Sequence, residues 1–168
     1  MNITTYLAAR LPDDEAKRQR ATEHSGILQR VGDPSLMAQA AKARRYARAN
    51  SGMVCAVSHY NVFVIGHDGV RPGVFSRSIS FVGHLIMDNA DDLVVPDAAK
   101  DGRFSGYPLV ESGEVAFYAA AGLRAADRCL IGALCVTSRM PRLDWNGADQ
   151  RILSSLAVEA SRLITVRE

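Results

Sequence analysis

Two apolar, β-branched segments that nearly abut constrain the fold of this chain more than any other feature. MVCAVSH occupies residues 53–59 and NVFVIGH occupies residues 61–67, so Tyr60 alone separates them. Runs of this length and composition are typical of buried β-strands, and a connection this short favours a hairpin. Since a hairpin makes its two strands antiparallel, the sequence predicts an antiparallel sheet rather than a doubly wound fold.

Helical patterns lie at both ends of the chain. Residues 12–29 begin with a proline and three acidic residues, which suit the positive end of a helix. A second helix is predicted to use Ser35 as its N-cap and to run to about Asn50. Residues 146–164 repeat apolar side chains every three or four positions, as in an amphipathic helix. Strands in the middle and helices at both ends indicate the α+β class.

Shorter elements fill the region between the hairpin and the last helix. Residues 68–80 contain two glycines and a proline and are predicted to form a loop. A short helical segment is expected at residues 81–87. Further strands are expected at residues 93–95, 115–123 and 129–137.

The segment VVPDAAKDGRF at residues 94–104 is predicted to close over one face of the sheet as a latch. Asp97 is expected to cap the single helical turn that follows it. Arg103 is able to hold Asp97, Asp101 or nearby carbonyls, because its guanidinium carries five donors in one plane. Phe104 is expected to anchor the latch to the core. Two interpretations stay open for the acids: caps and one salt bridge alone, or direct contact with a ligand.

The size and composition fit one soluble domain. The chain has 168 residues, of which 48% are hydrophobic and 23% are charged. We expect residues 1–11 to form a tail and residues 12–168 to form a single domain. No apolar run approaches the roughly 18 to 20 residues that span a bilayer, and the start of the chain lacks a secretory signal pattern. We therefore expect a cytoplasmic protein without membrane attachment.

Charge, cysteine content and motifs argue against several further classes. A net charge of +2 does not indicate nucleic-acid binding, and the basic segment KARRYAR at residues 42–48 is interpreted as a solvated helix face. The three cysteines are an odd number among small apolar residues, so no disulfide framework is expected. The histidines show no metal-ligand spacing, and no phosphate-binding loop or nucleophile elbow is present. The sequence thus predicts no catalytic site and no metal site.

Four segments, in this order, resemble one protein family. They are SFVGHLI (80–86), LVVPDAAKDGRFSGYPLV (93–110), VAFYAAAGL (115–123) and LIGALCVTSRMPR (130–142). Together they resemble the GAF domains of bacterial sensor kinases, diguanylate cyclases and related regulators, and the similarity covers nearly the whole chain. The resemblance implies a central antiparallel sheet with the N- and C-terminal helices packed on one face. It also implies a pocket between the other face and a cover formed by residues 68–114.

The resemblance implies a sensory function as well. GAF domains often dimerise through their terminal helices and pass a signal to an effector. We therefore expect noncovalent binding of a small molecule of unidentified chemistry, relayed through the terminal helices to a signalling-protein partner. The apolar stripe of the last helix, together with the first helix, supports two interpretations, a homodimer contact or a cover for the sheet within one subunit. The alternative function is a protein–protein interaction module whose pocket is filled by its own side chains.

Candidate ligand-binding residues come from the same segments. The resemblance places His84 on the pocket side of the short helix and makes Tyr118 a candidate for orienting a polar ligand. Phe117 and Tyr118 are adjacent on a strand and must point to opposite faces, so one of them faces the pocket. Each candidate also fits a purely structural role. The full set is Phe81, His84, Asp97, Arg103, Phe104 and Tyr118.

The cysteine positions bear on two further alternatives. Many relatives carry a cysteine where this chain has Val82, and no Cys-His pair is present, so covalent attachment of a tetrapyrrole is not expected. One GAF branch reduces free methionine sulfoxide with cysteines, and this thiol enzyme is the least favoured alternative. Cys129 and Cys135 lie on one predicted strand, about 20 Å apart, too far for a disulfide. Cys55 is able to approach Cys135 across neighbouring strands, but buried thiols react poorly.

Overall fold

An antiparallel sheet forms the centre of the molecule in the computed structural model, which describes residues 6–165. Its six strands lie in the order β3-β2-β1-β6-β5-β4, and every neighbouring pair is antiparallel. The strands are β1 (Ser51–Ser58), β2 (Asn61–Asp68), β3 (Val74–Ser76), β4 (Asp92–Val95), β5 (Phe117–Arg124) and β6 (Leu130–Ser138). The predicted antiparallel sheet and the α+β class are confirmed.

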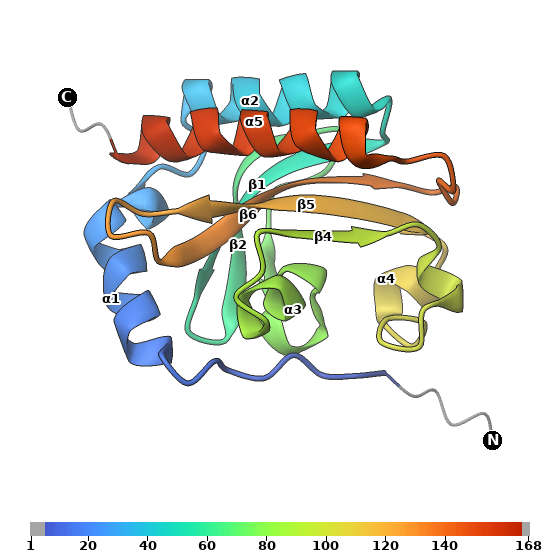
Figure 1. Cartoon of the computed structure of the whole chain (residues 1–168), viewed down its shortest axis with the longest axis horizontal. Helices are drawn as coiled ribbons and strands as arrows, with labels where there is room; N and C mark the ends of the chain where they lie inside the picture. Colours follow the sequence, from blue (N-terminus) through green and yellow to red (C-terminus); the bar gives the residue numbers. More distant parts are fainter. Residues whose placement is uncertain (1–5, 166–168) are drawn as a thin grey trace.

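Helices cover both faces of this sheet (Figure 1). α2 (Pro34–Ala47) and α5 (Gly147–Thr165) lie side by side over one face. α3 (Phe81–Met87) and α4 (Pro108–Glu111) lie on the opposite side, and α1 (Glu15–Ser25) lies at one end of the sheet. The apolar stripe of α5 therefore covers the sheet within one chain, which is one of the two interpretations that the sequence left open.

The β1–β2 hairpin follows from the local sequence. His59 and Tyr60 join the two strands, and Val57 pairs with Val62 across the turn. His59 has a φ of 51°, the left-handed conformation that a tight two-residue turn requires. The observed strands begin and end within two residues of the predicted ones.

The ends of the first two helices differ in detail from the prediction. Gly26, at a φ of 71°, ends α1, so the predicted helix at 12–29 consists of α1 and a following 3-10 turn. Asp33, not Ser35, caps α2, because its side chain accepts a hydrogen bond from the Ser35 backbone N–H at 2.9 Å. α2 also ends three residues before the predicted Asn50.

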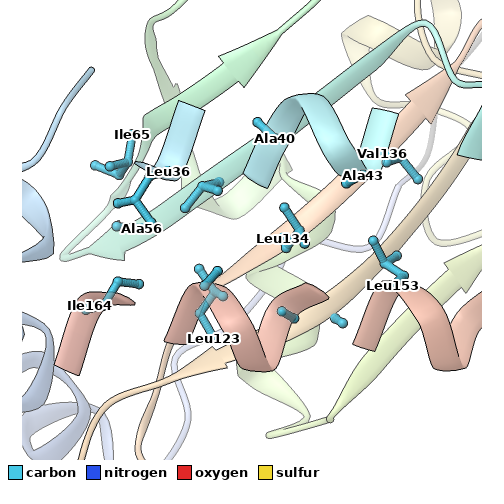
Figure 2. Close-up of a cluster of buried hydrophobic side chains, with 14 of the residues drawn as sticks. Leu36, Ala40, Ala43, Ala56, Ile65, Leu123, Leu134, Val136, Leu153 and Ile164 are labelled. Atoms are coloured by element: carbon cyan, nitrogen blue, oxygen red, sulfur yellow. The ribbon is translucent and has the colours of Figure 1, made fainter. Parts of the chain in front are cut away.

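Alternation along the strands builds a hydrophobic core between the sheet and the two long helices (Figure 2). Leu123 and Leu134 of the sheet belong to this cluster with Leu36 of α2 and Leu153 of α5. The helix backbone comes close to the sheet at Gly66, where a Cβ atom would lie 2.5 Å from the Leu36 carbonyl oxygen. A glycine at that position therefore allows α2 to pack directly on β2.

Residues 6–11 run along the other side of the molecule, below α3 in Figure 1. The Leu7 backbone N–H donates to the Arg103 carbonyl at 3.1 Å, and the Ala9 N–H donates to the Ser78 carbonyl at 2.9 Å. The sequence assigns these residues to a tail, of which residues 1–5 lie outside the described part of the chain. The described part of that segment is hydrogen-bonded to the domain.

Candidate functional site

The face of the sheet opposite α2 and α5 forms the floor of a cavity. Cys55 on β1, Cys135 on β6 and Tyr118 on β5 share this face, because side chains alternate along each strand. The walls come from residues between 75 and 82 and between 107 and 115. The cavity has a volume of about 380 Å³ and a mostly apolar lining. Small-molecule sites usually have about 300–1,000 Å³, so this one lies near the lower end.

Tyr118 is the buried polar group of the floor. Its ring stacks on Phe81, with ring centroids 4.5 Å apart and planes inclined by 13°. Its hydroxyl is buried and has no hydrogen-bond partner among the described residues. An unpaired buried hydroxyl costs about 1–3 kcal/mol, which a hydrogen bond donated to a bound molecule would offset. Burial raises the pKa of this hydroxyl, and Cys135 and Cys55 add to that effect, so it stays protonated.

Two thiols share the floor with Tyr118. Cys55 pairs with Ala133 and Cys135 pairs with Met53, which makes the two cysteines diagonal neighbours on adjacent strands. The Cys135 thiol and burial together raise the pKa of Cys55 well above its ordinary value. Both cysteines are free and buried. The structure therefore shows Cys55 near Cys135 across neighbouring strands, as the sequence allowed.

His84 lies behind the cavity wall and is absent from the lining. Its Nε2 lies 2.7 Å from the Leu7 carbonyl oxygen and 2.8 Å from the Tyr107 hydroxyl oxygen. That hydroxyl also donates to the Leu7 carbonyl, at 2.9 Å. Burial lowers the pKa of His84, although the Leu7 carbonyl opposes the change. In this structure His84 fastens the N-terminal segment to α3.

The latch supports the cavity wall from behind. Asp97 makes no side-chain hydrogen bond to the turn that follows it, so the predicted cap is wrong. Arg103 instead donates to Asp101 at 3.0 and 2.7 Å, and these hydrogen bonds lower the pKa of Asp101. Phe104 is fully buried, with its ring centroid 4.7 Å from that of Phe81, and thus anchors the latch as predicted.

The structure separates the six candidate residues into two groups. Phe81 and Tyr118 line the cavity, whereas His84, Asp97, Arg103 and Phe104 do not. Sequence reasoning missed Met53 and Cys55 on β1 and Ile79 and Val115 in the walls. Period-two alternation along the predicted strand groups Met53 with Cys55, but it does not tell which face of the sheet stays free of the long helices.

Charged side chains mark the mouth of the cavity. Among the described residues that line it, Glu114 and Arg139 are the charged ones, and both are exposed. Further inside, the hydroxyls of Ser51 and Thr137 are hydrogen-bonded to each other. The cavity therefore changes from polar at its mouth to mostly apolar at its floor.

An ion-pair network joins the cavity wall to α1. Arg77 lies in the 3-10 turn Arg77–Ile79 and donates to Glu15 of α1 at 2.9 Å. Arg18 donates to the same carboxylate through two nitrogens, each at 2.9 Å. Burial disfavours ionisation of Glu15, but the hydrogen bonds from Arg77 and Arg18 outweigh it and lower the pKa to about 2. A wall segment that includes Ile79 and Phe81 is thus connected to the first helix.

Metal-binding and membrane-spanning features are absent from residues 6–165. No cluster of three or more His, Cys, Asp or Glu side chains suited to a metal ion occurs in this range. None of its helices combines the length and the apolar character needed to cross a bilayer.

Comparison with known proteins assigns the family. The GAF domain family model matches residues 36–164, so this chain belongs to the GAF domain family. The cyclic di-GMP phosphodiesterase PA2567 of Pseudomonas aeruginosa is 29% identical to it over 159 residues. That match covers 93% of this chain and 27% of the phosphodiesterase, so the chain spans about a quarter of this relative.

Solved structures share the fold at low sequence identity. The GAF domain of an Acinetobacter phosphoenolpyruvate-protein phosphotransferase has a TM-score of 0.64 and 15% identity, covering 88% of this chain and 92% of that one. The type II free methionine-R-sulfoxide reductase of Thermoplasma acidophilum has a TM-score of 0.64 and 13% identity, covering 86% and 94%. These similarities establish the fold, and the family is a sensory and regulatory one.

Proposed function

We propose that this GAF domain is a sensory module that binds a small molecule noncovalently in the cavity beside Tyr118. The observation that carries the proposal is a mostly apolar cavity of about 380 Å³ with a buried hydroxyl that has no partner among the described residues. Size and polarity of this kind are typical of small-molecule sites. An open cavity also favours sensing over the alternative of an interaction module with a filled pocket.

In this proposal the signal leaves through the terminal helices. α5 packs on β5 and β6, whose other face carries Tyr118 and Cys135. α1 is connected to the cavity wall through Glu15 and Arg77. A ligand acts by stabilising one arrangement of the wall and helices over another. The recipient is a signalling protein in the cytoplasm, reached directly or through a homodimer, and the three free cysteines fit a reducing compartment.

Native mass spectrometry of the purified chain, followed by a thermal-shift screen of small molecules, tests the proposal. A retained or selected compound should raise the melting temperature, because it binds the folded state. Val115→Phe adds a ring to the cavity wall and should abolish that shift. Val158→Phe makes the same change on an exposed position of α5 and should preserve it. Absence of any binder, or unchanged binding by folded Val115→Phe protein, would remove the proposal.

The thiol-enzyme alternative has weaker support. Catalysis by cysteine requires a reactive thiolate. Cys135 is buried beside Cys55, whose pKa is raised, and burial also raises the pKa of Cys129. An assay for reduction of free methionine sulfoxide, repeated with each cysteine replaced by serine, distinguishes the two functions. Activity that depends on one of the cysteines would favour the enzyme.

A further inference from the structure

We propose that the ligand of this cavity is an uncharged, largely apolar molecule that accepts a hydrogen bond from the Tyr118 hydroxyl through a carbonyl-type oxygen. The inference rests on the proposed function, since it specifies the chemistry of a guest in the same cavity. It follows from three features of the lining: an unsatisfied donor, the absence of a competing acceptor on the floor, and the position of the charges.

The Tyr118 hydroxyl is the unsatisfied donor. Tyr118 is 3% exposed, and its buried hydroxyl has no hydrogen-bond partner among the described residues. The other hydroxyl side chains of the lining are each hydrogen-bonded within the protein: Ser51, Ser76, Ser80, Tyr107 and Thr137. Two hydroxyls bonded to each other use one O–H between them, so Ser51 and Thr137 together keep one donor. The Tyr118 hydroxyl is the one in this lining that is buried without any partner among the described residues.

The groups next to Tyr118 do not provide a strong acceptor. Cys55 and Cys135 present thiols, which are weak donors and weak acceptors. No carboxylate or side-chain amide among the described lining residues lies on the floor strands β1, β5 and β6. A carbonyl oxygen accepts through two lone pairs and so complements a phenolic O–H flanked by thiols.

The position of the charged groups excludes a charge at the inner end of the ligand. Glu114 and Arg139 are exposed at the mouth, whereas the floor around Tyr118 is apolar apart from the hydroxyl and the thiols. An ion moved to this floor would lose its hydration without gaining an opposite charge, which is strongly unfavourable. A charged or strongly polar substituent fits at the mouth alone.

Three probes of similar size test the acceptor and the charge separately: acetophenone has a carbonyl oxygen, ethylbenzene has no polar group, and benzoate carries a negative charge. Titration calorimetry or ligand-observed NMR on the full chain should give acetophenone an affinity about tenfold above that of ethylbenzene, as one hydrogen bond provides. Benzoate should bind at least about tenfold more weakly than acetophenone, because its charge is not compensated at the floor.

Tyr118→Phe isolates the donor, because phenylalanine keeps the ring that stacks on Phe81 and removes the hydroxyl. This variant should reduce the affinity for acetophenone to that for ethylbenzene and leave ethylbenzene binding unchanged. Its urea midpoint should equal or exceed that of the wild type, because the change removes an unpaired buried hydroxyl. Tyr60→Phe, the same change at a position that is 73% exposed on the hairpin turn, should preserve the preference for acetophenone.

The outcomes distinguish this inference from the function on which it rests. Equal affinities for acetophenone and ethylbenzene, a preference for benzoate, or a preference for acetophenone that survives Tyr118→Phe would overturn the inference. The proposed function would stand in those cases, because the cavity would still take a guest. Failure of all three probes to bind folded protein at millimolar concentration would count against both.

Discussion

Glu15→Gln should destabilise the domain, because Glu15 is the counter-charge of two buried guanidinium groups. The side chains of Arg18 and Arg77 are each 3% exposed, and that of Glu15 is 19% exposed. Glutamine keeps the size of the side chain but leaves both arginines without a negative partner. Removing one member of a buried ion pair typically costs about 3–5 kcal/mol.

The pKa of Glu15 gives a second measure of the same effect. Burial works against ionisation, yet the hydrogen bonds from Arg77 and Arg18 lower the pKa from 4.5 to about 2. At about 1.36 kcal/mol per pKa unit, that difference corresponds to roughly 3 kcal/mol. Water that reaches the carboxylate screens part of it, so we expect a loss of about 2–3 kcal/mol at pH 7. This loss lowers the urea midpoint by about 1 M.

The effect should depend on pH in one direction. Because the pKa of Glu15 in the folded state is lowered to about 2, its stabilising contribution is fully present above about pH 4.5 and is lost as the pH falls toward 2. The difference in unfolding free energy between wild type and Glu15→Gln should therefore shrink between about pH 5 and pH 3.

Urea unfolding followed by circular dichroism at several pH values measures this difference. Glu23→Gln on the same helix is the matched control, because the Glu23 side chain is 54% exposed, and it should change stability by less than about 0.5 kcal/mol. The reasoning is refuted if Glu15→Gln stays within about 0.5 kcal/mol of the wild type at pH 7. A difference of the same size at pH 5 and pH 3 would refute it as well.

Packing and burial determine three further outcomes. Gly66→Ala should lower the unfolding free energy by about 1–3 kcal/mol, because the new methyl group meets the α2 backbone. Gly102→Ala is the control, because a methyl group there meets open space and should be near neutral. Equal urea midpoints for the two variants would contradict this packing. Leu134→Ala should cost about 2–5 kcal/mol in thermal unfolding, and a loss below about 1 kcal/mol would mean that the core is loosely packed. Burial lowers the pKa of His84 below 6.5, so the stability that the neutral ring provides is lost as the pH falls below about 6.5. The hydrogen-exchange protection factor of the Leu7 amide should then decrease between about pH 7.5 and pH 5.5, and a constant value would contradict the role of His84.

Local patterns in the sequence determine where the elements lie. The predicted helix at 81–87 coincides with α3, and β1, β2 and α5 begin and end within two residues of their predicted bounds. Helix and strand periods depend on neighbours a few positions apart, which a single sequence displays. Phe104 was also predictable from the local sequence as the anchor of the latch, because it is a large apolar side chain in an otherwise polar turn. The cap at Asp97 was not, because the exact path of a short turn depends on what it packs against.

The two faces of the sheet show where local information ends. Alternation places Phe117 and Tyr118 on opposite faces, but it does not say which face receives the long helices. The structure puts Phe117 in the core beneath α2 and α5 and Tyr118 at the cavity. That assignment depends on how α2, α5 and the covering segments pack together, and so on the whole chain.

Contacts between distant parts of the chain were decided by the tertiary structure alone. Glu15 and Arg77 are 62 positions apart, and His84 and Leu7 are 77 positions apart. Nothing in the local sequence around either pair indicates its partner, because such contacts form when already-formed elements pack. The sequence by itself therefore determined the helices, the strands and the two alternating sets of side chains, while packing alone turned His84 toward the N-terminal segment and left Tyr118 facing the cavity.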